Sequence, residues 1–146
     1  RPGCVRPCVM RIVLDTNVTI SALFWKGYPR VIYDLVKDGK AILLWSRTIE
    51  AELIRVLAYS KFGLMSSEMF PIVNHLRSHA YFVEERSSIE IVKDDPTDNI
   101  FLECAVDGNA DYIISGDHHL LNLEGYKLIK IISAKDFLIQ EGFIKD

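Results

Sequence analysis

Two acidic residues in this chain follow short apolar segments of the kind that form buried strands. Asp15 comes directly after residues 12–14, and Asp117 follows residues 112–115 and a single glycine. Uninterrupted apolar runs of this length are typical of parallel strands that are buried on both faces. In open α/β sheets, sites form beyond the carboxyl ends of the strands. The pattern therefore predicts two carboxylates at one edge of a sheet, as the start of a site for a hard metal cation.

Each candidate acid also has a plain structural explanation. Asp15 and Asp117 both precede predicted helical segments, where Asp is a favoured N-cap. In the segment Asp95-Pro-Thr-Asp98, Asp95 is a good N-cap and the proline fits the first helical position. Asp98 then lies at the third position, where an acid interacts favourably with the helix dipole. Taken singly, none of these acids establishes a functional site.

Two further acids, Glu50 and Glu52, lie two residues apart on a predicted helix and therefore point to different sides of it. Periodicity does not choose between them. Several acids near one sheet edge would repel one another without a compensating charge. Mg²⁺ and Mn²⁺ prefer oxygen ligands, and such clusters serve phosphodiester hydrolysis, in which the metal activates a bound water.

Predicted strands and helices alternate along the chain. The predicted strands are residues 12–14, 41–45, 81–84, 112–115 and 128–132, with a short extended piece at 89–92. The predicted helices are residues 16–25, 31–37, 46–60, 67–79, 95–107 and 134–140, with a helical turn from Asp117. Pro71 is expected in or near the first turn of its helix. This alternation predicts an α/β fold, a three-layer α/β/α sandwich around a central, mainly parallel sheet.

The composition favours one globular domain. Hydrophobic residues make up 49% of the 146 residues and charged residues 25%. No apolar run approaches the roughly 18 residues that span a bilayer. Residues 1–9 lack the apolar core of a signal peptide. We interpret residues 1–9 as an upstream extension and residues 10–146 as a single domain, with Met10 as the initiator.

The three cysteines do not suggest a disulfide framework, since Cys4 and Cys8 fall in the extension and Cys104 in a predicted helix. A reducing cytoplasm is therefore the expected location. The net charge of −3 does not itself indicate nucleic-acid binding. Clustered acids contribute to this charge, and a bound divalent cation would reverse its sign locally.

Four motifs, in this order, resemble those of the PIN domain family, typified by the VapC-type toxins of bacterial and archaeal toxin–antitoxin pairs. They are Leu14-Asp15-Thr16-Asn17, Glu52-Leu-Ile-Arg55-Val-Leu57, Asp95-Pro-Thr-Asp98-Asn99 and Ala110-Asp-Tyr-Ile-Ile-Ser115-Gly-Asp117-His-His-Leu120-Leu121. The resemblance runs from Met10 to about Phe143. It implies a PIN-like nuclease domain that cleaves single-stranded or looped RNA with Mg²⁺ or Mn²⁺.

The same resemblance implies the site residues. The family's acids fall on Asp15, Glu52, Asp98 and Asp117, so the resemblance selects Glu52 over Glu50. Asn17 and Ser115 are implied as polar supports that orient carboxylates or water. A homodimer or higher homo-oligomer and a small antitoxin partner are expected from the family.

Other interpretations stay open at this point. An RNA-processing PIN nuclease outside a toxin–antitoxin pair would use the same acids, and a non-catalytic interaction module could retain them. Five basic residues could form a phosphate-binding rim or simply solvated helix faces: Lys26, Arg30, Arg47, Arg55 and Lys61. Trp25 and Trp45 are expected in the core or at an interface rather than as base-stacking platforms. His118 and His119 are expected to be solvated.

Overall fold

A six-stranded sheet in the order β3-β2-β1-β4-β6-β5 forms the centre of the computed structural model, which describes residues 9–59, 63–90 and 98–145. Its strands are β1 (Met10–Leu14), β2 (Ala41–Trp45), β3 (Ala80–Phe82), β4 (Tyr112–Ile114), β5 (Gly125–Tyr126) and β6 (Ile129–Ile132). Neighbouring strands in the series β3-β2-β1-β4-β6 are parallel, and the edge strand β5 pairs antiparallel to β6. The mainly parallel sheet that the sequence predicts is confirmed.

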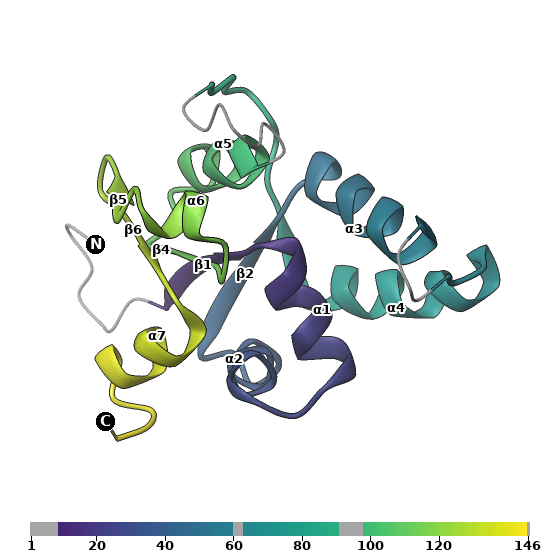
Figure 1. The fold of residues 1–146 in the computed structure, drawn as a ribbon, viewed down its shortest axis with the longest axis horizontal. Helices are drawn as coiled ribbons and strands as arrows, with labels where there is room; N and C mark the ends of the chain where they lie inside the picture. Colours follow the sequence, from purple (N-terminus) through teal and green to yellow (C-terminus); the bar gives the residue numbers. More distant parts are fainter. Residues whose placement is uncertain (1–8, 60–62, 91–97, 146) are drawn as a thin grey trace.

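Helices cover both faces of the sheet, which gives the predicted three-layer α/β/α sandwich (Figure 1). They are α1 (Thr16–Phe24), α2 (Tyr28–Lys37), α3 (Arg47–Tyr59), α4 (Ser66–His79), α5 (Asn99–Asp107), α6 (His118–Leu121) and α7 (Ala134–Gln140). The helices α1, α2 and α7 lie below the strands in Figure 1, and α5 lies above them against β1, β2 and β4. None of the described helices is long and apolar enough to cross a membrane.

The apolar composition of the central strands explains their place in the core. Ile12, Val13, Leu43 and Ile113 are fully buried, because helices pack on both sides of β1, β2 and β4. From β1 the chain adds β2 on one side, and later returns to add β4 on the other. This reversal of direction creates a crevice beyond the carboxyl ends of β1 and β4. The residues that follow these two strands therefore meet at one place.

Two helices differ from the sequence prediction for reasons connected with proline. α2 begins at Tyr28 rather than residue 31, because Pro29 occupies its first turn, where a missing N–H is harmless. Pro71 is the sixth residue of α4 and thus lies inside the helix rather than in its first turn. The expectation for Pro71 was wrong, and α4 lacks one backbone hydrogen bond there.

The shorter elements were also less accurate in the prediction. β3 begins and ends earlier than residues 81–84, and β4 ends at Ile114. Residues 89 and 90 are not in a strand, and the rest of the predicted piece at 89–92 lies outside the described residues. Residue 60, the predicted end of one helix, and Asp95, the predicted start of another, also lie outside the described residues. β5 was not predicted, because two residues leave no periodic pattern.

Candidate functional site

A pocket of about 140 Å³ lies beyond the carboxyl ends of β1 and β4. The four acids expected from the sequence line it, and they come from four separate segments: Asp15, Glu52, Asp98 and Asp117. Val56 and Phe101 add apolar wall, so the carboxylates lie against a surface of low polarity. We call this set the acidic pocket. The fold thus brings together side chains as far apart in the sequence as Asp15 and Asp117.

Asp15 leaves β1 and caps α1 at the same time. Its amide donates to the carbonyl of Ile114, at 3.1 Å, so the ladder between β1 and β4 extends to the acid itself. Its Oδ1 accepts from the amide of Val18 at 2.8 Å, which is the capping bond expected of an Asp before a helix. The second oxygen, Oδ2, accepts from the hydroxyl of Ser115. The structural explanation for Asp15 is therefore correct, yet it does not remove the carboxylate from the pocket.

Ser115 connects two of the four acids. It is fully buried, and its Oγ donates to Asp15 and accepts from the amide of Asp117 at 2.9 Å. Asp117 in turn caps α6, since its Oδ1 accepts from the amide of His119 at 2.8 Å. This hydroxyl thus fixes the relative position of the acids that follow β1 and β4.

Asp98 is 5% exposed and stands at the N-cap position of α5 with a helical backbone conformation. Its carboxylate makes no capping hydrogen bond to α5 among the residues that the structure describes. The proposed cap at Asp95 lies outside the described residues. Asp98 is thus buried at the start of α5 without serving as the side-chain cap of that helix.

Glu50 and Glu52, which periodicity could not separate, have different surroundings. Glu50 accepts from Arg77 Nε at 2.7 Å and Nη2 at 2.5 Å, and from the indole of Trp45 at 3.2 Å. Glu52 lines the acidic pocket and accepts from Arg55 Nε at 2.9 Å and Nη2 at 2.8 Å. Glu50 therefore belongs to an ion pair between α3 and α4, whereas Glu52 meets the three aspartates.

The pKa values of two of the buried acids, Asp15 and Glu50, are shifted in opposite directions. Burial raises the pKa of the Asp15 carboxyl above its ordinary value, and the negative charge of Asp117 adds to that rise. Hydrogen bonds from Ser115 and the backbone oppose it only in part. The Arg77 guanidinium lowers the pKa of Glu50. A cation bound in the acidic pocket would stabilise the ionised form of Asp15, which burial and the charge of Asp117 destabilise.

The remaining candidates are placed less decisively. Asn17 lines the pocket but is exposed, and among the described residues its side chain makes no hydrogen bond to the acids. Thr16, which the sequence did not single out, lines it with a buried Oγ1 that finds no partner within the described part of the chain. His118 and His119 stack on each other, with ring centroids 4.6 Å apart, and neither lines the pocket.

The donor set of the pocket fits a hard divalent cation. All four ionisable ligands are carboxylates, which Mg²⁺ and Mn²⁺ prefer to nitrogen or sulfur. No three His, Cys, Asp or Glu side chains within residues 9–59, 63–90 and 98–145 converge closely enough to hold an ion by themselves. Mg²⁺ is commonly bound through one or two carboxylates and keeps several of its waters. A volume of about 140 Å³ leaves room for them, since each water occupies about 30 Å³.

A family model for the PIN domain matches residues 11–119, which include all four acids of the pocket. A search of curated proteins finds none that matches the chain. The matched region covers β1 to the start of α6 and therefore most of the sheet as well as the pocket. PIN domains are generally nucleases, which agrees with carboxylates gathered at the switch point of a parallel sheet. The chain therefore belongs to the PIN domain family.

Proposed function

We propose that this chain is an endoribonuclease that uses Mg²⁺ or Mn²⁺ to hydrolyse phosphodiester bonds of single-stranded or looped RNA. The observation that supports this most strongly is the lining of one pocket by Asp15, Glu52, Asp98 and Asp117. Membership of a family of nucleases, which generally use divalent metals, supports the reaction class. Unpaired RNA presents an accessible phosphodiester, which a narrow pocket requires.

Each residue has a role in this proposal. Asp15, Asp98 and Asp117 hold the metal directly or through water, and Glu52 ligates it or accepts a proton from the attacking water. When bound, the ion lowers the pKa of that water and stabilises charge on the phosphate. Ser115 keeps Asp15 and Asp117 in register. Arg55 orients the Glu52 carboxylate through their ion pair.

The test is cleavage of a mixed-sequence single-stranded RNA with Mg²⁺, with Mn²⁺ and with EDTA. Asp98→Asn is the most informative variant, because its N-cap position offers a competing structural explanation. Asp38→Asn, the same change at the exposed C-cap of α2, is the matched control. We expect metal-dependent cutting that Asp98→Asn loses and Asp38→Asn keeps. Full activity in a folded Asp98→Asn variant would refute the assignment. No cutting together with no metal binding would indicate a non-catalytic interaction module.

We further propose that the biological role is that of a toxin in the cytoplasm, restrained by a small antitoxin and acting as a homodimer. The support is the resemblance of the four motifs to the toxin branch of the family. Expression of the wild-type chain, but not of Asp98→Asn, should arrest growth, and a short neighbouring reading frame should relieve the arrest. Absence of such a frame and of growth arrest would favour an RNA-processing nuclease instead.

A further inference from the structure

A second pocket, of about 410 Å³, lies between the end of α1, α2 and α4. Its lining includes Arg30, Lys37 and His75, and none of the residues that the structure assigns to this lining is a carboxylate. The chain as a whole carries a net charge of −3. This pocket is therefore a local concentration of positive charge that is separate from the acidic pocket, with which it shares no residue.

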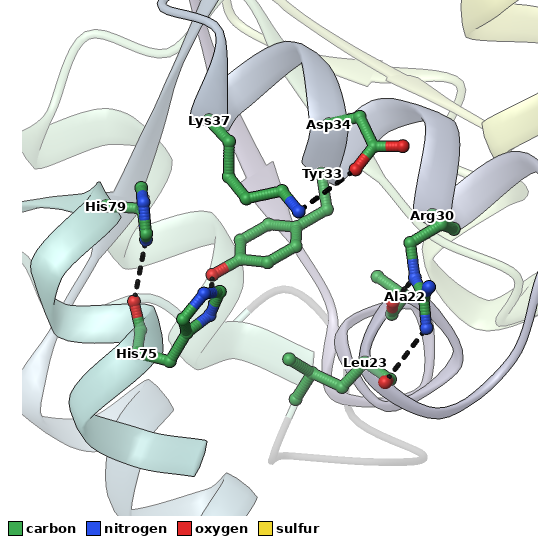
Figure 2. Close-up of polar contacts among 8 residues, drawn as sticks. All are labelled: Ala22, Leu23, Arg30, Tyr33, Asp34, Lys37, His75 and His79. Carbon is green, nitrogen blue, oxygen red and sulfur yellow. Dashed lines mark hydrogen bonds and ion pairs between the residues drawn. The ribbon is translucent and has the colours of Figure 1, made fainter. Parts of the chain in front are cut away.

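Arg30 is held in a fixed orientation at the mouth of this pocket. Its Nε donates to the carbonyl of Ala22 at 2.6 Å, and its Nη2 donates to that of Leu23 at 3.0 Å (Figure 2). A guanidinium has five N–H donors, so three remain after these two bonds. The protein has thus already bound the flexible side chain in place, and the remaining donors suit the oxygens of a phosphate.

Lys37 on α2 adds a second positive charge to this pocket, and His75 and His79 on α4 lie next to each other as hydrogen-bonding rings. Lys37 lies over the ring of Tyr33, 5.4 Å from its centroid, and the Tyr33 hydroxyl is 2.8 Å from His75 Nδ1. His75 and His79 are 4.7 Å apart between ring centroids (Figure 2). Partial burial and the positive charges of His79 and Lys37 lower the pKa of His75. Asp34 pairs with Lys37 at 3.1 Å, but both are exposed, so this ion pair competes weakly with a bound anion.

Aromatic side chains border this basic pocket. Phe24 lines it, and Trp25 packs edge-on against Phe24 with ring centroids 6.0 Å apart. Trp25 is 49% exposed, whereas the other tryptophan, Trp45, is 1% exposed. Tyr28 is also exposed, at the start of α2. Exposed aromatic rings interleaved with Lys and Arg are typical of surfaces that bind single-stranded nucleic acid, because bases stack on the rings and phosphates meet the cations.

We propose that this surface, which we call the α1–α2 corner (Phe24, Trp25, Tyr28, Arg30, Lys37 and His75), binds a segment of the RNA substrate away from the cleaved bond. The inference deepens the proposed nuclease function and rests on it for the identity of the ligand. The helix α1 begins at Asp15 in the acidic pocket and ends at the corner. Its nine residues span about 13 Å, so one RNA strand of several nucleotides can reach both places.

The experiment measures RNA binding by fluorescence anisotropy in EDTA, so that it does not depend on cleavage. Two single-stranded RNAs are compared, one of about 16 nucleotides and one of about four, the range that single-stranded binding sites cover. The variants are Lys37→Glu, which reverses one charge, and Trp25→Leu, which keeps an apolar side chain but removes the ring. The matched control is Lys127→Glu, the same charge reversal beside the β5 edge strand at the far end of the sheet from β3.

We expect both corner variants to bind the longer RNA about tenfold more weakly, with a smaller salt dependence for Lys37→Glu. Lys127→Glu should bind both RNAs as the wild type does. The longer RNA should also quench tryptophan emission in the wild-type protein but not in Trp25→Leu, since Trp45 is buried. Corner variants that bind the longer RNA like wild type would overturn the proposal and leave the corner as a surface for a protein partner.

Cleavage of the same RNA with Mn²⁺ separates this inference from the proposed function. If the corner variants lose RNA binding but the wild-type protein cuts no RNA with Mn²⁺, the proposed nuclease function is rejected and the corner remains an RNA-binding surface. A protein that cuts RNA, while its corner variants bind normally, would retain the nuclease and reject the corner. Failure of the wild-type protein to bind either RNA would also reject the corner as an RNA-binding surface.

Discussion

Two buried carboxylates in this protein, Glu50 and Asp15, show what separates an acid that the fold neutralises from one that it does not. Arg77 meets both oxygens of Glu50, and its guanidinium lowers the pKa of that carboxyl. Around Asp15 the direction is reversed: burial raises the pKa, and the negative charge of Asp117 raises it further. Glu50 connects α3 to α4, whereas the carboxylate of Asp15 would gain a compensating positive charge from a bound cation. This contrast is our reason for assigning a ligand to the acidic pocket.

The largest expected effect is on catalysis, and it tests the difference between Asp15 and Glu50. Asp15→Asn should lower metal-dependent RNA cleavage by more than about 100-fold, because changing even residues that support metal ligands costs about 10- to 100-fold. Asn is as good an N-cap as Asp, so α1 should stay intact. Glu50→Gln should keep activity within a few-fold, measured on the same RNA with Mn²⁺. Equal losses in the two variants would remove the distinction between the regions.

A smaller loss is expected for the hydroxyl that joins two of the acids. Ser115→Ala should reduce cleavage by about tenfold, because Asp15 loses the donor to its Oδ2 and the Asp117 amide loses its acceptor. Ser78→Ala removes a hydroxyl that bonds locally within α4 and should leave the rate unchanged. A Ser115→Ala enzyme with the wild-type rate would show that the orientation of Asp15 does not depend on this bond.

Stability should respond in the other region. Glu50→Gln should lower the free energy of unfolding by about 1 kcal/mol, less than is usual for a hydrogen bond to a charged group because the Arg77 side chain is half exposed. The thermal midpoint should fall by about 2–4 °C. Because the pKa of folded Glu50 is lowered, its ion pair stabilises the protein above about pH 4.5 and loses that contribution as the pH falls further. The difference between variant and wild type should therefore shrink in acid. A difference that persists at low pH would mean that lost packing, not charge, is the cause.

The smallest effect concerns Asp15 in metal-free protein. A raised pKa means that ionised Asp15 destabilises the folded state, a penalty absent well below its ordinary value of 3.8 and present once the pH exceeds the folded pKa. Asp15→Asn removes the charge, so in EDTA at neutral pH its thermal midpoint should be slightly above that of wild type. A lower midpoint in EDTA would show that the Ser115 bond outweighs the cost of burying the charge.

The sequence predicted the parts of this structure that depend on local pattern. The apolar runs of β1, β2 and β4, and the acids directly beyond them, follow from strand periodicity and from the geometry of parallel sheets. Pro29 and Pro71 were assigned less well, because a proline constrains the residues before it but does not state how far the helix extends. β5 exists only because β6 offers an edge to pair with.

Long-range partners account for what the sequence did not decide. Glu50 and Glu52 differ because Arg77, on another helix, reaches one and not the other. A local sequence pattern around Glu50 does not reveal that contact, because its partner lies on another helix. Ser115 and Asp15 are likewise a hundred residues apart, and only the family resemblance suggested Ser115. Of the two tryptophans expected in the core or at an interface, Trp45 lies in the core, whereas Trp25 is exposed and no contact with another chain tests its place.

The most direct test of the acidic pocket is calorimetric titration of the protein with Mn²⁺, which requires no knowledge of the RNA target. Wild type and Glu50→Gln should bind the ion with similar affinity, and Asp15→Asn should bind it at least tenfold more weakly. This result would show that Asp15 belongs to the metal site and that loss of a buried carboxylate elsewhere does not weaken metal binding. Absence of Mn²⁺ binding by wild type, or equal binding by wild type and Asp15→Asn, would contradict the account.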